Sequence, residues 1–120
     1  MYNCDYYTRP NGRKPCKEFI DSLSAKDKAK VYSKIDILRR EGKLLIATHV
    51  LEKIENFSKK EKQDKELYEL VCGRCRVGTY FDARSQAFMF LCGWEKTQRK
   101  QPSDIEHCRS LLHEYLDKGV

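Results

Sequence analysis

The stretch from Leu67 to Lys100 constrains the fold most strongly, because its residues alternate as those of sheet strands do. The alternating residues of its middle segment are Val77, Thr79 and Phe81 in one set and Arg76, Gly78 and Tyr80 in the other. A strand sends the two sets to opposite faces of its sheet. Since helices bury the apolar face, we expect the face of Arg76 and Tyr80 to remain open to a ligand.

Turn signals divide this stretch into three strands. Residues 67–72, 75–82 and 87–95 are separated by Gly73-Arg74 and by residues 83–86, which predicts an antiparallel meander. Residues 2–8 and 50–54 predict two further short strands.

Three helices are predicted around these strands. Pro15 suits the first position of a short helix that ends near residue 23. Ser24 is a predicted N-cap and Gly42 a predicted left-handed C-cap of a helix over residues 25–41. Ser103 with Glu106 is a predicted capping box for a helix that continues to Gly119.

These elements predict a single domain over residues 1–120. Its fold class is α+β, with an N-terminal helical hairpin and a C-terminal helix packed on a small antiparallel sheet. The nearly continuous charged and amide residues from 55 to 66 predict a mobile loop or a frayed helical turn, because they offer little apolar surface to bury.

The charge balance favours an anionic partner. Lysine and arginine number 24 against 18 acidic residues, a net charge of +6, which favours nucleic acid ahead of a membrane surface. No apolar run approaches the roughly 18 residues of a membrane span, and the first ten residues contain no apolar signal core. We therefore expect a cytoplasmic protein with reduced cysteines and no membrane partner.

The cysteine motif Cys72-Gly73-Arg74-Cys75 suggests a zinc knuckle or a redox dithiol. A zinc site needs about four ligands, and no second pair of this spacing accompanies the motif. A thioredoxin-type dithiol lies at a helix N-terminus, whereas this one lies between two predicted strands. A β-turn flanked by facing cysteines is the favoured interpretation, and we expect no metal and no cofactor.

Cationic and aromatic residues gather near the end of the predicted meander. The cations are Arg76, Lys96, Arg99, Lys100 and Lys53, and the rings are those of Tyr80 and Trp94. Cations bind phosphates and rings stack on bases, so this combination on a sheet face is typical of single-stranded RNA binding. The alternative, that Trp94 is a core residue and residues 96–100 form a solvated turn, stays open.

Four motifs together carry a resemblance to a known family. They are Asn11-Gly12-x-x-Pro15-x-x-Glu18-Phe19-Ile20-x-x-Leu23, Leu67-Tyr68-Glu69-Leu70, Arg76-Val77 with Tyr80-Phe81-Asp82, and Gly93-Trp94-x-Lys96-Thr97-Gln98 with Pro102. With the closing helix, they resemble the RelE/HigB toxin superfamily of type II toxin-antitoxin modules, and in particular its phage-derived HigB branch. The resemblance covers nearly the whole chain.

The resemblance implies a microbial-ribonuclease-like toxin that enters the ribosomal A site and cleaves mRNA by 2′-hydroxyl attack on the adjacent phosphate. It also implies a neutralising antitoxin, expected to be a helix-turn-helix protein of the HigA type. Arg76 then stabilises the phosphorane, Lys96 and Arg99 supply phosphate contact or acid-base function, and Tyr80 orients the nucleophile or stacks a base. Lys53, Lys100 and Trp94 are the implied RNA-binding residues.

Two alternatives belong to other functional classes. One is a non-enzymatic toxin of the ParE type that acts on DNA gyrase, and the other is a basic RNA-binding module. The cluster of Arg76, Lys96 and Arg99 distinguishes them, because an endonuclease needs it and a gyrase binder does not.

Overall fold

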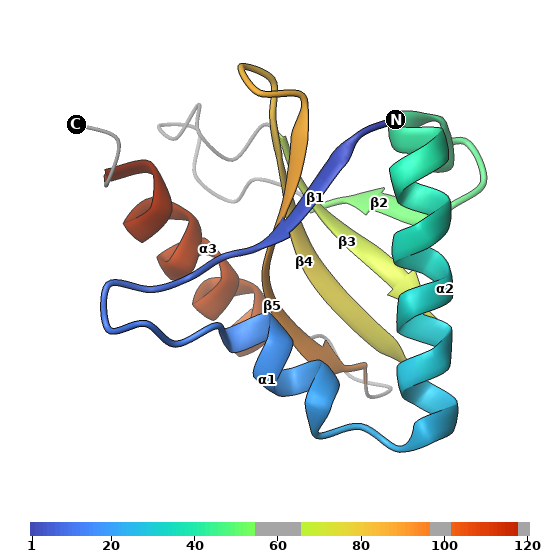
Figure 1. Cartoon of the computed structure of the whole chain (residues 1–120), viewed down its shortest axis with the longest axis horizontal. Helices are drawn as coiled ribbons and strands as arrows, with labels where there is room; N and C mark the ends of the chain where they lie inside the picture. The colour runs from blue at the N-terminus through green and yellow to red at the C-terminus, as the bar shows by residue number, and fades with distance from the viewer. Residues whose placement is uncertain (55–65, 97–101, 118–120) are drawn as a thin grey trace.

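Five strands form one mixed sheet in the part of the chain that this computed structural model describes, residues 1–54, 66–96 and 102–117. The strands are β1 (Asn3–Tyr6), β2 (Leu51–Lys53), β3 (Leu67–Cys72), β4 (Cys75–Asp82) and β5 (Ala87–Glu95). Their order across the sheet is β1-β5-β4-β3-β2, so the predicted meander forms its centre (Figure 1).

The meander has the predicted boundaries. β3 and β4 are joined by the Gly73-Arg74 turn, in which Gly73 has a φ of +63° and the flanking Cys72 and Cys75 are paired directly. A positive φ favours glycine, which explains why a tight turn forms here. β4 and β5 pair from Asp82 with Ala87 to Cys75 with Glu95, with a register shift between Gly78 and Thr79.

The edge strand β1 departs from the prediction of an antiparallel sheet. It lies parallel to β5, with Asn3 opposite Ala87 and Tyr6 opposite Phe90, and the Tyr7 amide donates to the Phe90 carbonyl at 2.9 Å. The residues of a four-residue edge strand do not determine whether it runs parallel or antiparallel to its neighbour. That direction depends on the connections between the strands.

Helices cover both faces of the sheet (Figure 1). α1 (Pro15–Asp21) and α2 (Ala25–Glu41) pack on one face, and α3 (Pro102–Asp117) packs on the other. The predicted α+β class is therefore confirmed. None of the helices in the described ranges is long and apolar enough to span a membrane.

The helix ends test the capping predictions. The Ser24 side chain accepts a hydrogen bond from the Asp27 amide at 3.2 Å, as an N-cap does. Gly42 has the predicted positive φ, +57°, but its ψ of −134° is not that of a left-handed helical cap. The predicted capping box at Ser103 is wrong, because α3 begins at Pro102 and Ser103 lies inside its first turn.

Two segments near β2 complete the comparison with the predictions. A 3-10 helix, η1 (Gly42–Ile46), follows α2 and leads toward β2. The predicted mobile loop over residues 55–66 falls, apart from Glu66, outside the described residues.

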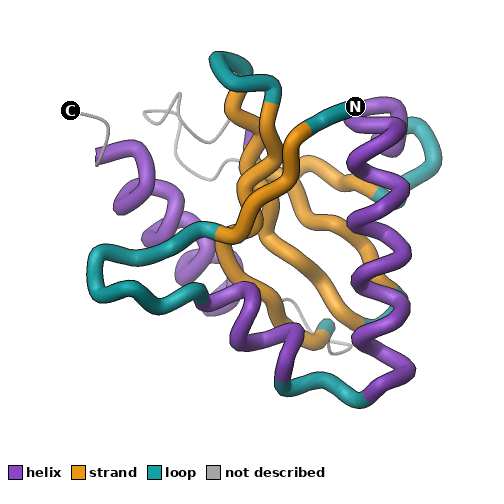
Figure 2. Tube along the Cα trace, in the orientation of Figure 1, coloured by secondary structure: helices purple, strands orange, loops and turns teal. Residues whose placement is uncertain are grey.

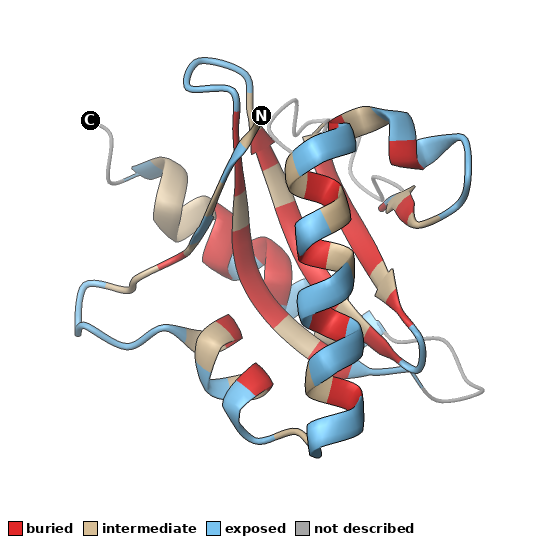
Figure 3. Ribbon diagram, turned by 45° about the vertical axis from the view of Figure 1, so that its right-hand side comes forward, coloured by how far each residue is buried: buried red, intermediate tan, exposed pale blue. Residues whose placement is uncertain are grey.

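The two faces of the sheet bury separate apolar clusters (Figure 3). The cluster under α1 and α2 includes Ile20, Val31, Leu38, Leu70, Val77 and Phe88. The cluster under α3 includes Leu67, Leu91, Trp94, Cys108, Leu111 and Leu112. We call these surfaces the α1/α2 face and the α3 face.

Candidate functional site

Arg76 and Tyr80 share the α3 face, as the alternation of β4 predicts. The rows of residues that lie side by side across β3, β4 and β5 on this face are Val71–Arg76–Trp94, Glu69–Gly78–Cys92 and Leu67–Tyr80–Met89. Directly opposed residues of an antiparallel pair point to the same face. The register therefore adds a carboxylate, Glu69, to the face of Arg76.

The expectation that this face is open is wrong at its centre. Gly78 lies beneath α3, so closely that a Cβ there would clash with the Cys108 Sγ. The apolar stripe of α3 must be buried against some surface, and the strip of sheet without a side chain at Gly78 accepts it. α3 thus separates Tyr80 from the end of the face that carries Arg76.

The backbone of the β3–β4 turn fixes the Arg76 guanidinium. Its Nη1 donates to the Gly73 carbonyl at 2.6 Å and to the Cys75 carbonyl at 3.0 Å. The turn itself is held to α2, because the Arg74 guanidinium donates to Asp27 Oδ2 from Nη2 at 2.7 Å and from Nε at 3.1 Å. These bonds with Arg74 are the main reason that the pKa of Asp27 lies below its usual value.

Glu69 stands beside this guanidinium. Its Oε1 lies 3.4 Å from Arg76 Nε, and the two side chains are only 10% and 12% exposed. Nε is buried and, apart from this ion pair with Glu69, has no hydrogen-bond partner in the described ranges. Buried polar groups normally have well-formed hydrogen bonds, so a guanidinium held only loosely by its carboxylate is suited to bind an anionic ligand as well.

Burial raises the pKa of the Glu69 carboxyl, and the neighbouring Glu52 carboxylate raises it further. Arg76 and Lys96 act in the opposite direction, but the net shift is upward. Glu52 lies directly opposite Glu69 in the β2–β3 pair. A carboxyl whose pKa is moved toward neutrality can accept and return a proton at working pH.

Lys96 lies at the edge of this site. It follows β5 directly, its amide donates to the Arg74 carbonyl at 2.8 Å, and its side chain is exposed. Its positive charge, like that of Arg76, opposes the rise in the pKa of the Glu69 carboxyl. We call Glu69, Arg76 and Lys96 the Glu69 site.

The other predicted residues are distributed differently. Lys53 is exposed and pairs with Tyr68, whose ring belongs to the α1/α2 cluster, so Lys53 lies on the face opposite Arg76. The predicted convergence of Lys53 with Arg76 is therefore wrong. Strand alternation explains this, because neighbouring residues point to opposite faces. Glu52 points to the face of Glu69, and Lys53 therefore points to the other.

The two predicted stacking residues are largely covered. Trp94 is 5% exposed and belongs to the α3 cluster, which agrees with the alternative interpretation of this residue as core. Tyr80 is half-buried and packs edge-on against Tyr115 of α3 at a centroid distance of 6.1 Å. Arg99 and Lys100 lie outside the described residues.

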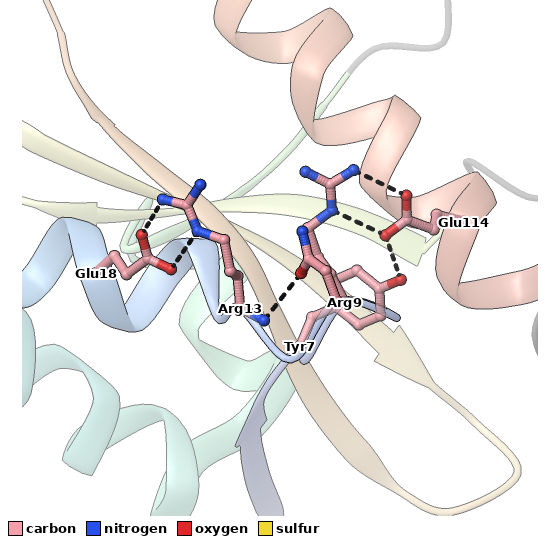
Figure 4. Close-up of polar contacts among 6 residues, drawn as sticks. Tyr7, Arg9, Arg13, Glu18 and Glu114 are labelled. Atoms are coloured by element: carbon pink, nitrogen blue, oxygen red, sulfur yellow. Dashed lines mark hydrogen bonds and ion pairs between the residues drawn. The ribbon is translucent and has the colours of Figure 1, made fainter.

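Polar contacts fix the far half of α3. The loop of residues 7–14 crosses between β1 and α1 on the side of α3 (Figure 2). From it, the Tyr7 hydroxyl donates to Glu114 Oε1 at 2.7 Å, and Arg9 forms a two-pronged ion pair with the same carboxylate, with both distances 3.1 Å (Figure 4). The Tyr115 hydroxyl donates to Asp82 at 3.1 Å.

The cysteine motif forms the turn that the sequence favours. Cys72 and Cys75 are opposite each other, buried and not disulfide-bonded. Within the described ranges, no three His, Cys, Asp or Glu side chains lie close enough together to hold a metal ion.

The candidate site residue that sequence reasoning missed is Glu69. Its signal was its position, because Glu69 interrupts the apolar run of Leu67 to Cys72. Pairing across the turn puts its side chain on the same face of the sheet as that of Arg76. A carboxylate buried in a strand is uncommon unless it is paired. Counting back from the turn would have predicted the pair.

Comparison with known proteins gives a likeness in fold. No protein-family model matches the chain, and no curated protein matches it in sequence. The RelE toxin in the RelBE2 toxin-antitoxin complex of Mycobacterium tuberculosis superposes with a TM-score of 0.55 at 14% identity, covering 79% of this chain and 91% of that chain. The archaeal RelE–RelB complex of Pyrococcus horikoshii gives 0.56 at 15% identity, covering 82% and 98%. The expected RelE-like fold is thereby confirmed.

Proposed function

We propose that this protein is the toxin of a type II toxin-antitoxin pair and that it is an endoribonuclease acting on mRNA. The observation that carries the proposal is the Glu69 carboxyl beside the Arg76 guanidinium, with Lys96 at the edge of the same site. The fold that the chain shares with RelE toxins of toxin-antitoxin complexes supports it, as does the net charge of +6.

Each residue of the Glu69 site has a role in this reaction. Glu69 takes the proton of the ribose 2′-hydroxyl as its oxygen attacks the adjacent phosphorus. Arg76 places its guanidinium charge beside the phosphate oxygens, where negative charge builds up in the transition state. The Lys96 ammonium contacts the phosphate and gives a proton to the departing 5′-oxygen, which leaves a 2′,3′-cyclic phosphate.

The buried ion pair supports function rather than stability. Removing two charges from water is costly, and a buried pair often contributes little net stability. A carboxyl with a raised pKa beside an arginine is the arrangement expected where chemistry takes place. Arg99 and Lys100 extend the proposed phosphate contacts, and Tyr80 is the proposed base contact.

The proposed setting follows the resemblance of the motifs to the HigB branch. The chain would act in the cytoplasm on mRNA in the ribosomal A site and be neutralised by a helix-turn-helix antitoxin of the HigA type. No cofactor enters the proposed reaction, because a carboxylate, a guanidinium and an ammonium supply its base, charge stabilisation and acid.

The test is induced expression of the wild-type chain and of an Arg76→Ala/Lys96→Ala variant, with mapping of cellular mRNA 5′ ends. We expect growth arrest and new ends inside translated frames with the wild type, and neither with the variant. Lys53→Ala is the matched control, since it removes an exposed cation from the other face and should leave cleavage unchanged.

Two outcomes would contradict the proposal. Growth arrest with intact mRNA would favour a gyrase-directed toxin of the ParE type. Absence of arrest, with folded protein confirmed by circular dichroism, would favour a basic RNA-binding module.

A further inference from the structure

Two thiols from different elements meet on the α3 face. Cys92 of β5 and Cys108 of α3 belong to the same apolar cluster, and both lie against Gly78 of β4. Their residues are 4% and 0% exposed, and neither forms a disulfide. The proposed RNA cleavage uses neither of them.

The contact is built by Gly78. Gly78 lies directly opposite Cys92 in the β4–β5 pair, and its missing side chain leaves the space that the Cys108 Sγ occupies. Any other residue at position 78 would push Cys108 away from the sheet. The two sulfurs are therefore neighbours because of a specific packing arrangement.

The other buried cysteines have a different setting. Cys16, Cys72 and Cys75 belong to the cluster on the α1/α2 face, so the sheet lies between them and Cys108. Cys72 and Cys75 also oppose each other, but they are joined by a two-residue turn within one hairpin. The Cys92 and Cys108 pair instead joins α3 to β5 within the cluster of the α3 face.

We propose that Cys92 and Cys108 are a reversible oxidation site, at which a hydroperoxide converts the two thiols into a disulfide that fixes α3 on the sheet. This inference is independent of the proposed function. It assigns a second chemistry to the molecule, carried by residues outside the Glu69 site.

The reaction balances in two steps. The Cys92 sulfur attacks one oxygen of hydrogen peroxide, the O–O bond breaks, and Cys92 becomes a sulfenic acid as one water leaves. The Cys108 sulfur then attacks the Cys92 sulfur, the S–S bond forms, and the sulfenic oxygen leaves as a second water with the Cys108 proton. In total two thiols and one peroxide give one disulfide and two waters.

The local environment sets the order and the speed of these steps. The neighbouring Cys92 thiol, together with burial, holds the pKa of Cys108 well above the ordinary thiol value. Cys108 therefore keeps its proton, and the proposed order begins at Cys92, the less buried of the two. Since the thiolate is the reactive form and both residues are buried, we expect slow oxidation at neutral pH that accelerates as pH rises.

The test is peptide mapping after oxidation of the full chain. The folded protein is treated with hydrogen peroxide, quenched with catalase, alkylated in denaturant without reductant and digested with trypsin. Cleavage after Arg84, Lys96, Lys100 and Arg109 places Cys92 in residues 85–96 and Cys108 in residues 101–109. We expect these two peptides to be joined by a disulfide, and dithiothreitol to separate them.

A second measurement follows the effect on the fold. A disulfide between these positions closes a loop of about 15 residues and should raise the Tm by roughly 10 °C. The rise should vanish on reduction. It should be absent in Cys92→Ser and in Cys108→Ser, and present in Cys16→Ser, which removes a buried thiol from the other face.

Two results would overturn the proposal. One is a folded, peroxide-treated chain in which residues 85–96 and 101–109 remain unlinked while other cysteines are oxidised. The other is a link between them with no change in Tm, which would show that the bond forms in an already opened chain. Neither result bears on RNA cleavage, which is measured in untreated protein.

Discussion

The two faces of the sheet differ in what they bury. On the α1/α2 face, Leu70, Val77 and Phe88 are fully buried beneath two helices, and the sheet contributes apolar side chains to that cluster. On the α3 face, one helix covers an apolar area, and beside it Glu69 and Arg76 form a largely buried ion pair. The first face is built for stability, and the second combines stability with charged chemistry.

The two faces also hold their helices differently. α1 and α2 follow one another directly and share one apolar cluster with the sheet. Polar contacts hold α2 near its start, where Asp27 accepts from Arg74, and α3 in its far half, from Glu114 to Tyr7 and Arg9 and from Tyr115 to Asp82. A face covered by a single helix can expose charged neighbours at its margin, which is what a binding site requires.

Truncation of large core residues should separate the two faces most strongly. Phe88→Ala removes a fully buried ring from the α1/α2 face and should lower the free energy of unfolding by about 4 kcal/mol. Leu112→Ala on the α3 face should lower it by about 3 kcal/mol. Urea unfolding checks both, and a larger loss for Leu112→Ala would reverse the ranking of the faces.

The two sheet glycines offer a matched pair. A Cβ at Gly78 would clash with the fully buried Cys108, whereas one at Gly93 would clash with the half-buried Phe19 ring. Because the Phe19 ring has room to turn, Gly78→Ala should lower the free energy of unfolding by about 2–3 kcal/mol and Gly93→Ala by about 1 kcal/mol. Equal losses in urea unfolding would show that the packing of α3 adjusts to an added methyl group as easily as the packing of α1.

The hydrogen bond from Tyr7 to Glu114 tests how α3 is held. Tyr7→Phe keeps the ring and removes the hydroxyl that donates at 2.7 Å, so it should lower the free energy of unfolding by about 1 kcal/mol. Hydrogen exchange should speed up in α3 and stay unchanged in α2. Equal acceleration in both helices would mean that α3 does not open independently.

The smallest expected effect is a pH dependence of stability. The pKa of Glu69 is raised in the folded chain, mainly by burial, so the folded state favours the protonated carboxyl. The contribution of Glu69 to wild-type stability is therefore fully present below the usual glutamate pKa. It is lost as pH rises through the pKa that Glu69 has in the folded chain. Glu69→Gln, which cannot ionise, should gain stability relative to the wild type over that range in urea titrations. A stability advantage of Glu69→Gln over the wild type that shrinks with rising pH would contradict the upward shift of the Glu69 pKa.

Much of the fold follows from local signals in the sequence. The three strands of the meander, the Gly73-Arg74 turn and the helix from Ala25 to Glu41 depend on alternation, turn residues and an N-cap, all of which act over a few positions. The direction of β1 and the packing of α3 over Gly78 depend on contacts between distant residues. No local pattern determines them.

The site divides in the same way. Alternation correctly places Arg76 and Tyr80 on one face, but it cannot show that a helix lies between them. Lys53 was assigned to this site by its charge, although its parity puts it on the other face. Glu69 was missed because its role depends on the register of two strands across a turn.

The most direct test of the account is the pH profile of single-turnover mRNA cleavage on programmed ribosomes, for the wild type and for Glu69→Gln. We predict a wild-type rate that rises with pH as Glu69 ionises. In the variant, the rate should fall by about 10²–10⁴-fold and lose this dependence. Lys53→Ala should match the wild type in both respects. A Glu69→Gln variant that cleaves at the wild-type rate with the same pH profile would contradict the assignment of Glu69 as the base.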